Sequence, residues 1–196
     1  MYTSRTGLTL GFHGTDEAIA QAVLNGRAEL KAQNNPYDWL GNGIYFWDNS
    51  PSRALQWATE LSVRPKSHIR KPAVIGAILD LGHCLDLLDY DNLAYLHEAH
   101  QLLVTTLEAT STRVPVNSGK THDLLFRELD CAVIETLHAS FAVEQKPAFD
   151  SVRGVFWEGD PIYHTAGFRE KNHIQICVRN LDCIKGYFLP LLRITS

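Results

Sequence analysis

The sequence predicts a domain of the α+β class. Six segments have strand character and four have helix character, and the two longest helices stand together between the third and fourth strands. The last strands follow one another through short links, which is typical of antiparallel pairing. This segregation of helices from strands favours α+β with a largely antiparallel sheet over a doubly wound parallel sheet.

Composition limits the class of protein. The chain has 196 residues, of which 45% are hydrophobic and 20% charged, enough for one globular domain with a core. Its formal net charge of −4 does not suggest bulk electrostatic binding to nucleic acid. The four cysteines form no CxxC pair, so we expect neither a disulfide framework nor a zinc site. Because no segment has a secretory or membrane-spanning pattern, we expect a cytoplasmic protein without a membrane partner.

The first element is a strand that ends at a histidine. Apolar residues alternate along 7–13, and the chain then turns through Gly14. An imidazole at His13 would stand beside bare backbone, an arrangement that can hold a polar ligand.

The next helix has recognisable ends. It is predicted over 16–26, where Thr15 or Asp16 can act as N-cap and Gly26 closes the last turn. The segment 111–121 has the strongest loop character. The remaining predicted elements are strands at 44–47, 73–81, 152–158, 172–179 and 183–191, and helices at 52–62, 90–110 and 122–142.

The sequence GNGIYFWDNSPSRALQW over 41–57 combines a glycine-containing loop, a short aromatic strand and a helix start. The glycines allow close approach of the loop backbone, and proline is favoured in the first helical turn. Tyr45 on the strand and Trp57 on the helix could form two walls of a flat slot. Packing in the core is the alternative for Trp57.

Three segments together resemble a known family: GFHGT at 11–15, GNGIYF at 41–46, and NHIQICVRNLDCIKGYF at 172–188. They resemble the diphtheria-toxin-like, or PARP-like, class of ADP-ribosyltransferases. The resemblance covers about half of the chain and leaves the middle unmatched, as a helical insertion at about 85–150 in a domain of residues 1–196. It implies split, largely antiparallel β-sheets with flanking helices.

The resemblance also implies site residues. His13 would bind the adenosine-side ribose of NAD, and Gly14 with Thr15 would line the carboxamide site. Tyr45 would stack on nicotinamide. Ser52 would either donate to the nicotinamide amide or cap its helix. NAD is then the donor substrate, and no metal is expected.

The third catalytic position is a glutamine. In the family, a glutamate on a late strand lies nine positions before an apolar residue, and here Gln175 precedes Ile184 by that spacing. Glu170 is the alternative, in the charged loop before the strand. A glutamine can orient a ribose hydroxyl but cannot accept a proton as a carboxylate does. The resulting His-Tyr-Gln set therefore implies transfer of single ADP-ribose units.

The acceptor stays open among protein, RNA and DNA. Tyr163 lies in the loop where the family contacts its acceptor. A small catalytic domain of this kind resembles bacterial toxins and phage-defence effectors, which implies a neutralising antitoxin partner. An NAD glycohydrolase and a non-catalytic module that binds NAD or ADP-ribose are the alternative functions.

Other motifs are weaker. NSGKT at 117–121 lacks the first glycine of a phosphate-binding loop. His97 and His100 share a helix face without an evident third metal ligand. A basic cluster could steer a phosphate-rich acceptor, although an exposed loop is the favoured explanation. Its members are Arg64, Lys66, His68, Arg70 and Lys71.

Overall fold

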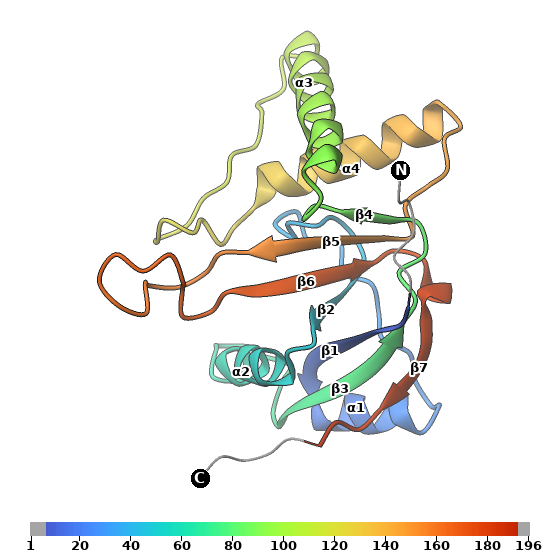
Figure 1. The fold of residues 1–196 in the computed structure, drawn as a ribbon, viewed down its shortest axis with the longest axis vertical. Helices are drawn as coiled ribbons and strands as arrows, with labels where there is room; N and C mark the ends of the chain where they lie inside the picture. Colours follow the sequence, from blue (N-terminus) through green and yellow to red (C-terminus); the bar gives the residue numbers. More distant parts are fainter. Residues whose placement is uncertain (1–6, 192–196) are drawn as a thin grey trace.

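The structure is a computed structural model that describes residues 7–191. Its centre is one seven-stranded sheet in the order β4-β5-β6-β2-β1-β3-β7 (Figure 1). All neighbouring strands are antiparallel except β4 and β5. Four α-helices flank the sheet, so the prediction of an α+β class with largely antiparallel pairing is confirmed. The expected division into two sheets is not seen, because hydrogen bonds connect all seven strands in one order.

Strands and helices alternate along the first part of the chain, and α3 and α4 then follow one another before the last three strands. The strands are β1 (Thr9–Asp16), β2 (Ile44–Asp48), β3 (Pro72–Leu79), β4 (Cys84–Asp86), β5 (Ser151–Phe156), β6 (His173–Val178) and β7 (Ile184–Phe188). The helices are α1 (Glu17–Leu24), α2 (Pro51–Ser62), α3 (Leu93–Ala109) and α4 (Glu128–Val143), with short 3₁₀ helices at Tyr90–Asn92 and Leu181–Cys183.

Local capping explains the bounds of α1. The Asp16 side chain accepts a hydrogen bond from the Ala18 backbone N–H, which satisfies one free donor of the first turn. At the other end, Gly26 has a φ of +66°, and its N–H donates to the Val23 carbonyl. Arg27 closes the same turn with a second backbone bond. The predicted roles of Asp16 and Gly26 are therefore confirmed.

The helix predicted over 122–142 begins only at α4, so its predicted start is wrong. Ser118 and Phe126 pair with each other and close the preceding segment as a loop. The Asn117 side-chain oxygen then accepts from the backbone N–H groups of Leu129 and Asp130, at 2.9 and 3.2 Å. A cap from outside the helix therefore sets its first turn.

Three other elements differ from what the sequence predicts. Strand β4 was not predicted, the helix expected over 90–110 begins with a 3₁₀ turn, and the last strand ends at Phe188. The stretch from 181 to 183 is a 3₁₀ helix, because the Asn180 side chain accepts from the Asp182 backbone N–H and turns the chain there.

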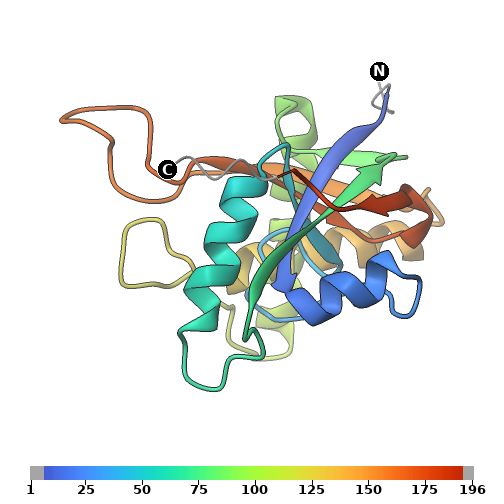
Figure 2. The ribbon, with the colours of Figure 1, turned by 90° about the horizontal axis from the view of Figure 1, so that it is seen from below.

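Helices cover both faces of the sheet. Helix α1 packs on a core cluster that includes Phe46, Ile75 and Ile176, all fully buried. On the opposite face, α2 packs on Phe12 and Trp47, while α3 and α4 cover a cluster farther along the sheet. Figure 2 shows α1 and α2 on either side of β1 and β3.

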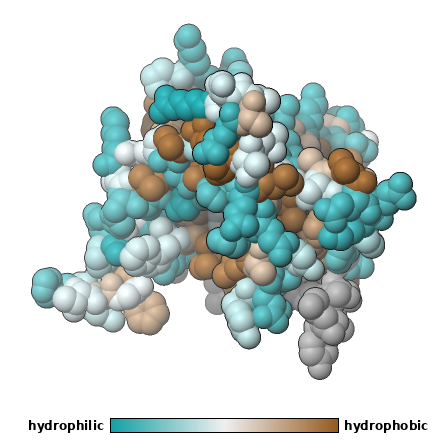
Figure 3. All heavy atoms as spheres, turned by 90° about the horizontal axis from the view of Figure 1, so that it is seen from above, coloured by the Kyte–Doolittle hydropathy of each residue, from teal (hydrophilic) through white to brown (hydrophobic). Residues whose placement is uncertain are grey.

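The face of the molecule at the α3 end is mainly hydrophilic, with hydrophobic side chains scattered between polar ones (Figure 3). Of the helices in residues 7–191, none is both long and apolar enough to cross a membrane. Cys131, Cys177 and Cys183 are buried thiols.

Candidate functional site

The three residues predicted to be catalytic lie on three neighbouring strands. His13 is on β1, Tyr45 on β2 and Gln175 on β6, and β2 is hydrogen-bonded to both other strands. Trp47 on β2 pairs with Phe12 on one side and with Gln175 on the other. The sheet thus brings segments from both ends of the chain together at its centre.

A hydrogen bond fixes the imidazole of His13. Its Nδ1 lies 2.8 Å from the carbonyl oxygen of Tyr45. Because a carbonyl only accepts, Nδ1 carries the proton in this bond, and the neutral ring keeps a lone pair on Nε2. Burial lowers the pKa of His13, although the same hydrogen bond opposes that shift. The ring can therefore accept a hydrogen bond from a hydroxyl group.

Strand register places His13 on the other face of the sheet from the two remaining residues. Paired residues share a face, so Phe12, Trp47 and Gln175 project together, and Tyr45 lies two residues from Trp47 on the same side. His13 projects oppositely, with its ring 5.8 Å from that of Phe46. The pairing of β1 with β2 ends at Phe12, so the His13 side chain bonds β2 where the strand pairing has stopped.

The hydroxyl of Tyr45 is engaged within the protein. It accepts from the Leu40 backbone N–H at 2.9 Å and donates to the Gly41 carbonyl at 2.8 Å. Burial raises the pKa of Tyr45 well above its ordinary value. The hydroxyl therefore stays protonated and holds the loop before β2, while the ring packs on the cluster beneath α4.

Gln175 accepts a hydrogen bond through its side-chain carbonyl. The indole Nε1 of Trp39 donates to its Oε1 at 2.6 Å. No partner of its amide nitrogen occurs among residues 7–191. Gln175 thus offers donors to a ligand, whereas His13 offers an acceptor.

Helix α2 packs closely against the strand at Gly14. A Cβ on Gly14 would overlap the carbonyl oxygen of Ala54 in α2, so helix and strand are in direct contact there. Thr15 is buried beside Gly14 in the same strand. The side of Gly14 on which a side chain would stand is therefore covered by α2.

Two residues of α2, Trp57 and Ser52, were each expected in one of two roles. The Trp57 ring lies 5.5 Å from that of Trp47 and packs on the cluster beneath α2, which agrees with the alternative of packing in the core, whereas Tyr45 packs on the cluster beneath α4. Ser52 is exposed within the first turn and is not the N-cap. Ser50 takes the cap position, because Pro51 is the first helical residue.

Tyr163 and Glu170 lie in the loop that joins β5 to β6, which extends away from the sheet (Figure 1). Both are exposed. The Glu170 backbone N–H donates to the Asp160 carbonyl and keeps this residue in the loop. The carboxylate of Glu170 is thus presented to solvent, while Gln175 lies within the sheet.

The sequence did not reveal a buried charged cluster on the face of Gln175. Arg53 of α2 donates through Nη2 to both carboxylate oxygens of Glu158, at 3.0 and 2.8 Å. Both residues are 8% exposed, and the Nε and Nη1 atoms of Arg53 are buried without a protein partner. His173 lies beside the pair, and burial lowers its pKa to about 4. The sequence gives no sign of this pairing, because charged side chains are normally exposed.

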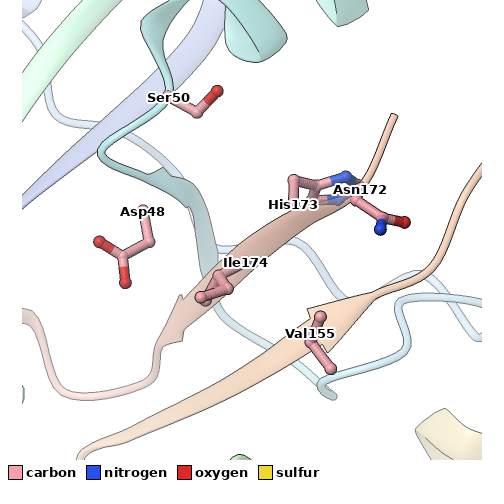
Figure 4. A pocket seen from close by; sticks show the side chains of 6 residues that line it. All are labelled: Asp48, Ser50, Val155, Asn172, His173 and Ile174. Carbon is pink, nitrogen blue, oxygen red and sulfur yellow. The ribbon is translucent and has the colours of Figure 1, made fainter. Parts of the chain in front are cut away.

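Two cavities lie next to this region. One of about 330 Å³ opens where β2 and β6 part, and its lining is Asp48, Ser50, Val155, Asn172, His173 and Ile174 (Figure 4). The other, of about 350 Å³, lies between α3 and α4 and has Trp39, His97, His100 and Arg127 in its wall. Neither cavity is lined by His13 or Tyr45. In the described part of the chain no group of three potential metal ligands occurs.

The predicted basic cluster lies in the exposed turn after α2. The backbone N–H groups of Arg70 and Lys71 donate to the Asp16 carboxylate, at 2.7 and 3.0 Å. Lys71 also pairs with Glu17 at 3.3 Å. Acidic side chains of β1 and α1 thus offset part of the positive charge of this turn.

The chain has a distant relative among known proteins. No family model matches the chain, and no solved structure matches it. The chain is similar to the uncharacterized protein MJ0359 of Methanocaldococcus jannaschii, with 25% identity over 190 residues. The alignment covers 89% of this chain and 83% of the archaeal protein, so the similarity extends through nearly the whole domain.

Proposed function

We propose that this protein is an NAD-dependent mono-ADP-ribosyltransferase with a PARP-like fold. It transfers ADP-ribose from NAD to a macromolecular acceptor, either protein or nucleic acid, and releases nicotinamide. The observation that supports this most is the position of His13, Tyr45 and Gln175 on adjacent strands, with the His13 ring held by the Tyr45 carbonyl.

The hydrogen-bonding groups of the site suit a sugar. A ribose hydroxyl both donates and accepts, so it can donate to Nε2 of His13 or accept from the amide nitrogen of Gln175. Neither group carries a charge at neutral pH. Such groups can bind and orient a ribose, and they neither attract nor repel the positively charged nicotinamide ring as an ion would.

The reaction needs little acid catalysis. The bond between the anomeric carbon and the nicotinamide nitrogen breaks, and its electron pair neutralises the cationic leaving group. A nucleophile of the acceptor forms the new bond and gives its proton to solvent. The transition state resembles an oxocarbenium ion, in which fixed hydrogen bonds to the sugar strengthen. Without a carboxylate at position 175, we expect single units rather than chains.

Nicotinamide release from NAD tests the proposal. The purified chain is incubated with labelled NAD and with separate protein and nucleic-acid fractions, and nicotinamide is measured by chromatography. We expect release by the natural chain and a loss of roughly 100-fold or more in His13→Ala, comparable to removing one transition-state hydrogen bond. His83→Ala is the matched control, because His83 also bonds a carbonyl through Nδ1, at 2.9 Å from Ala148.

The products separate the alternatives. Labelled adducts on protein or nucleic acid support transfer, whereas free ADP-ribose alone indicates an NAD glycohydrolase. Binding of NAD without nicotinamide release indicates a non-catalytic module. Full activity of His13→Ala would contradict the site, and absence of release under every condition would contradict the reaction. A neutralising partner, as in toxin and antitoxin pairs, would be found by its suppression of release.

A further inference from the structure

A hydrogen bond between distant segments determines how the Gln175 amide is turned. Trp39 stands between α1 and β2, 136 positions before Gln175. An indole N–H can donate but not accept, so only Oε1 of the amide can face it. The amide nitrogen of Gln175 is then directed elsewhere. One contact at 2.6 Å thus selects one of two orientations that are otherwise nearly equal in energy.

The sheet provides a place for the Trp39 ring. Gly154 of β5 lies directly opposite Gln175, and a Cβ at that position would come within 2.9 Å of the indole. The Phe156 ring meets the indole edge to face, at 4.9 Å between centroids. A glycine and an aromatic side chain on the same strand therefore hold the indole next to Gln175.

Tyr45 holds the loop that carries this indole. Its hydroxyl bonds the N–H of Leu40 and the carbonyl of Gly41, the two residues that follow Trp39. Leu40 is fully buried, and Gly41 has a φ of +79°, which favours glycine. The hydroxyl therefore fixes the backbone immediately after Trp39.

We propose that Trp39 is a positioning residue that orients the Gln175 amide, and that the Tyr45 hydroxyl acts on the same amide by holding Trp39. This inference rests on the proposed function for its effect on catalysis. It gives the tyrosine two separable parts: a ring available for packing or stacking, and a hydroxyl coupled to Gln175 through the loop.

Kinetics of nicotinamide release test the catalytic effect. Trp39→Phe removes the indole donor, and Tyr45→Phe removes a hydroxyl that makes two hydrogen bonds; both keep an aromatic ring. We expect each to lower kcat about 5- to 10-fold, the value of one hydrogen bond, with the KM for NAD within about twofold. The double variant should lose no more than either single variant, because both break the same connection. Losses that multiply, or an unchanged kcat in Trp39→Phe, would overturn the proposal.

Trp157→Phe is the matched control. Its indole also donates to a backbone carbonyl, that of Gly167 at 3.4 Å, but it lies in the exposed loop after β5. We expect its kcat to stay within about twofold of the natural chain. A loss equal to that of Trp39→Phe would show a general effect of indole removal and would contradict the specific role.

Nuclear magnetic resonance separates this inference from the reaction itself. In ¹⁵N-labelled protein, the Gln175 side-chain amide signal should shift in both Trp39→Phe and Tyr45→Phe, but not in Trp157→Phe. This result would support the coupling even if the natural chain releases no nicotinamide, in which case only the proposed function fails. A Gln175 signal that is unchanged in Tyr45→Phe would disprove the connection.

Discussion

The ion pair of Arg53 and Glu158 tests how α2 is joined to the loop between β5 and β6. It connects α2 to the first residues of the loop after β5, 105 positions later. The side chains are only 9% and 11% exposed. Lys171, at the other end of the same loop, pairs with Glu60 of α2 at 2.9 Å. Both ends of the loop are therefore held to one helix.

Removing Glu158 leaves the buried charge of Arg53 without its ionic partner, whereas Glu158 without Arg53 keeps only the more distant Lys171, at 3.9 Å. Such a change costs about 3–5 kcal/mol, whereas replacing both charges by apolar or neutral groups is often close to neutral. Two buried donors of Arg53 have no hydrogen-bond partner among residues 7–191, so the loss of Glu158 would leave the guanidinium with only the Trp47 ring, 5.8 Å away. We therefore expect Glu158→Gln and Arg53→Met each to lower the free energy of unfolding by about 3 kcal/mol. The double variant should lose clearly less than the sum of the two.

Urea denaturation followed by tryptophan fluorescence and circular dichroism measures this coupling. With a slope of about 2 kcal/mol per molar urea, each single variant should shift the midpoint by about 1.5 M. The exposed pair of Lys71 and Glu17 is the control, and Glu17→Gln should cost no more than about 0.5 kcal/mol. Single variants that cost under 1 kcal/mol, or costs that simply add in the double variant, would refute the role assigned to burial.

Two further predictions concern acid stability and the contact of α2 with β1. Burial lowers the pKa of His138 and His173 to about 4, so both stay neutral in the fold while the unfolded chain takes up protons near pH 6.5. Stability should fall as the pH falls from 6.5 toward 4. In a His138→Asn, His173→Asn double variant, the urea midpoint should change less with pH over this range than in the natural chain. An equal change with pH in both proteins would contradict this. Gly14→Ala should cost about 1–3 kcal/mol in the same assay, because the new methyl group meets Ala54; an unchanged midpoint would mean that α2 yields freely.

Elements with local signals could be predicted from the sequence. Helix α1 has its N-cap and its closing glycine within two residues of its ends, so its bounds follow from neighbouring residues. Helix α4 could not be placed as well, because the side chain that caps it, Asn117, lies at the far end of the preceding loop rather than next to the first turn. Strand β4 has three residues, too few to show alternation.

The candidate site was predictable in part for the same reason. Alternation along β6 predicts that His173 and Gln175 share a face, and their pairing with Phe156 and Gly154 confirms it. The partners of these residues could not be predicted, since Trp39 and Arg53 reach them only through the fold. A residue pair separated by more than a hundred positions leaves no periodic pattern in one sequence.

The register between β1 and β2 determines how NAD could bind if the proposed function holds. Alternation within one strand cannot show whether His13 and Gln175 share a face, because that depends on which residues pair across strands. The pairing of Phe12 with Trp47 sets His13 on the far side. A dinucleotide that touches both His13 and Gln175 must therefore pass where the pairing of β1 and β2 ends, next to the Tyr45 carbonyl. Substitutions that close this gap should then block binding of the whole dinucleotide while sparing nicotinamide alone, which needs only one face.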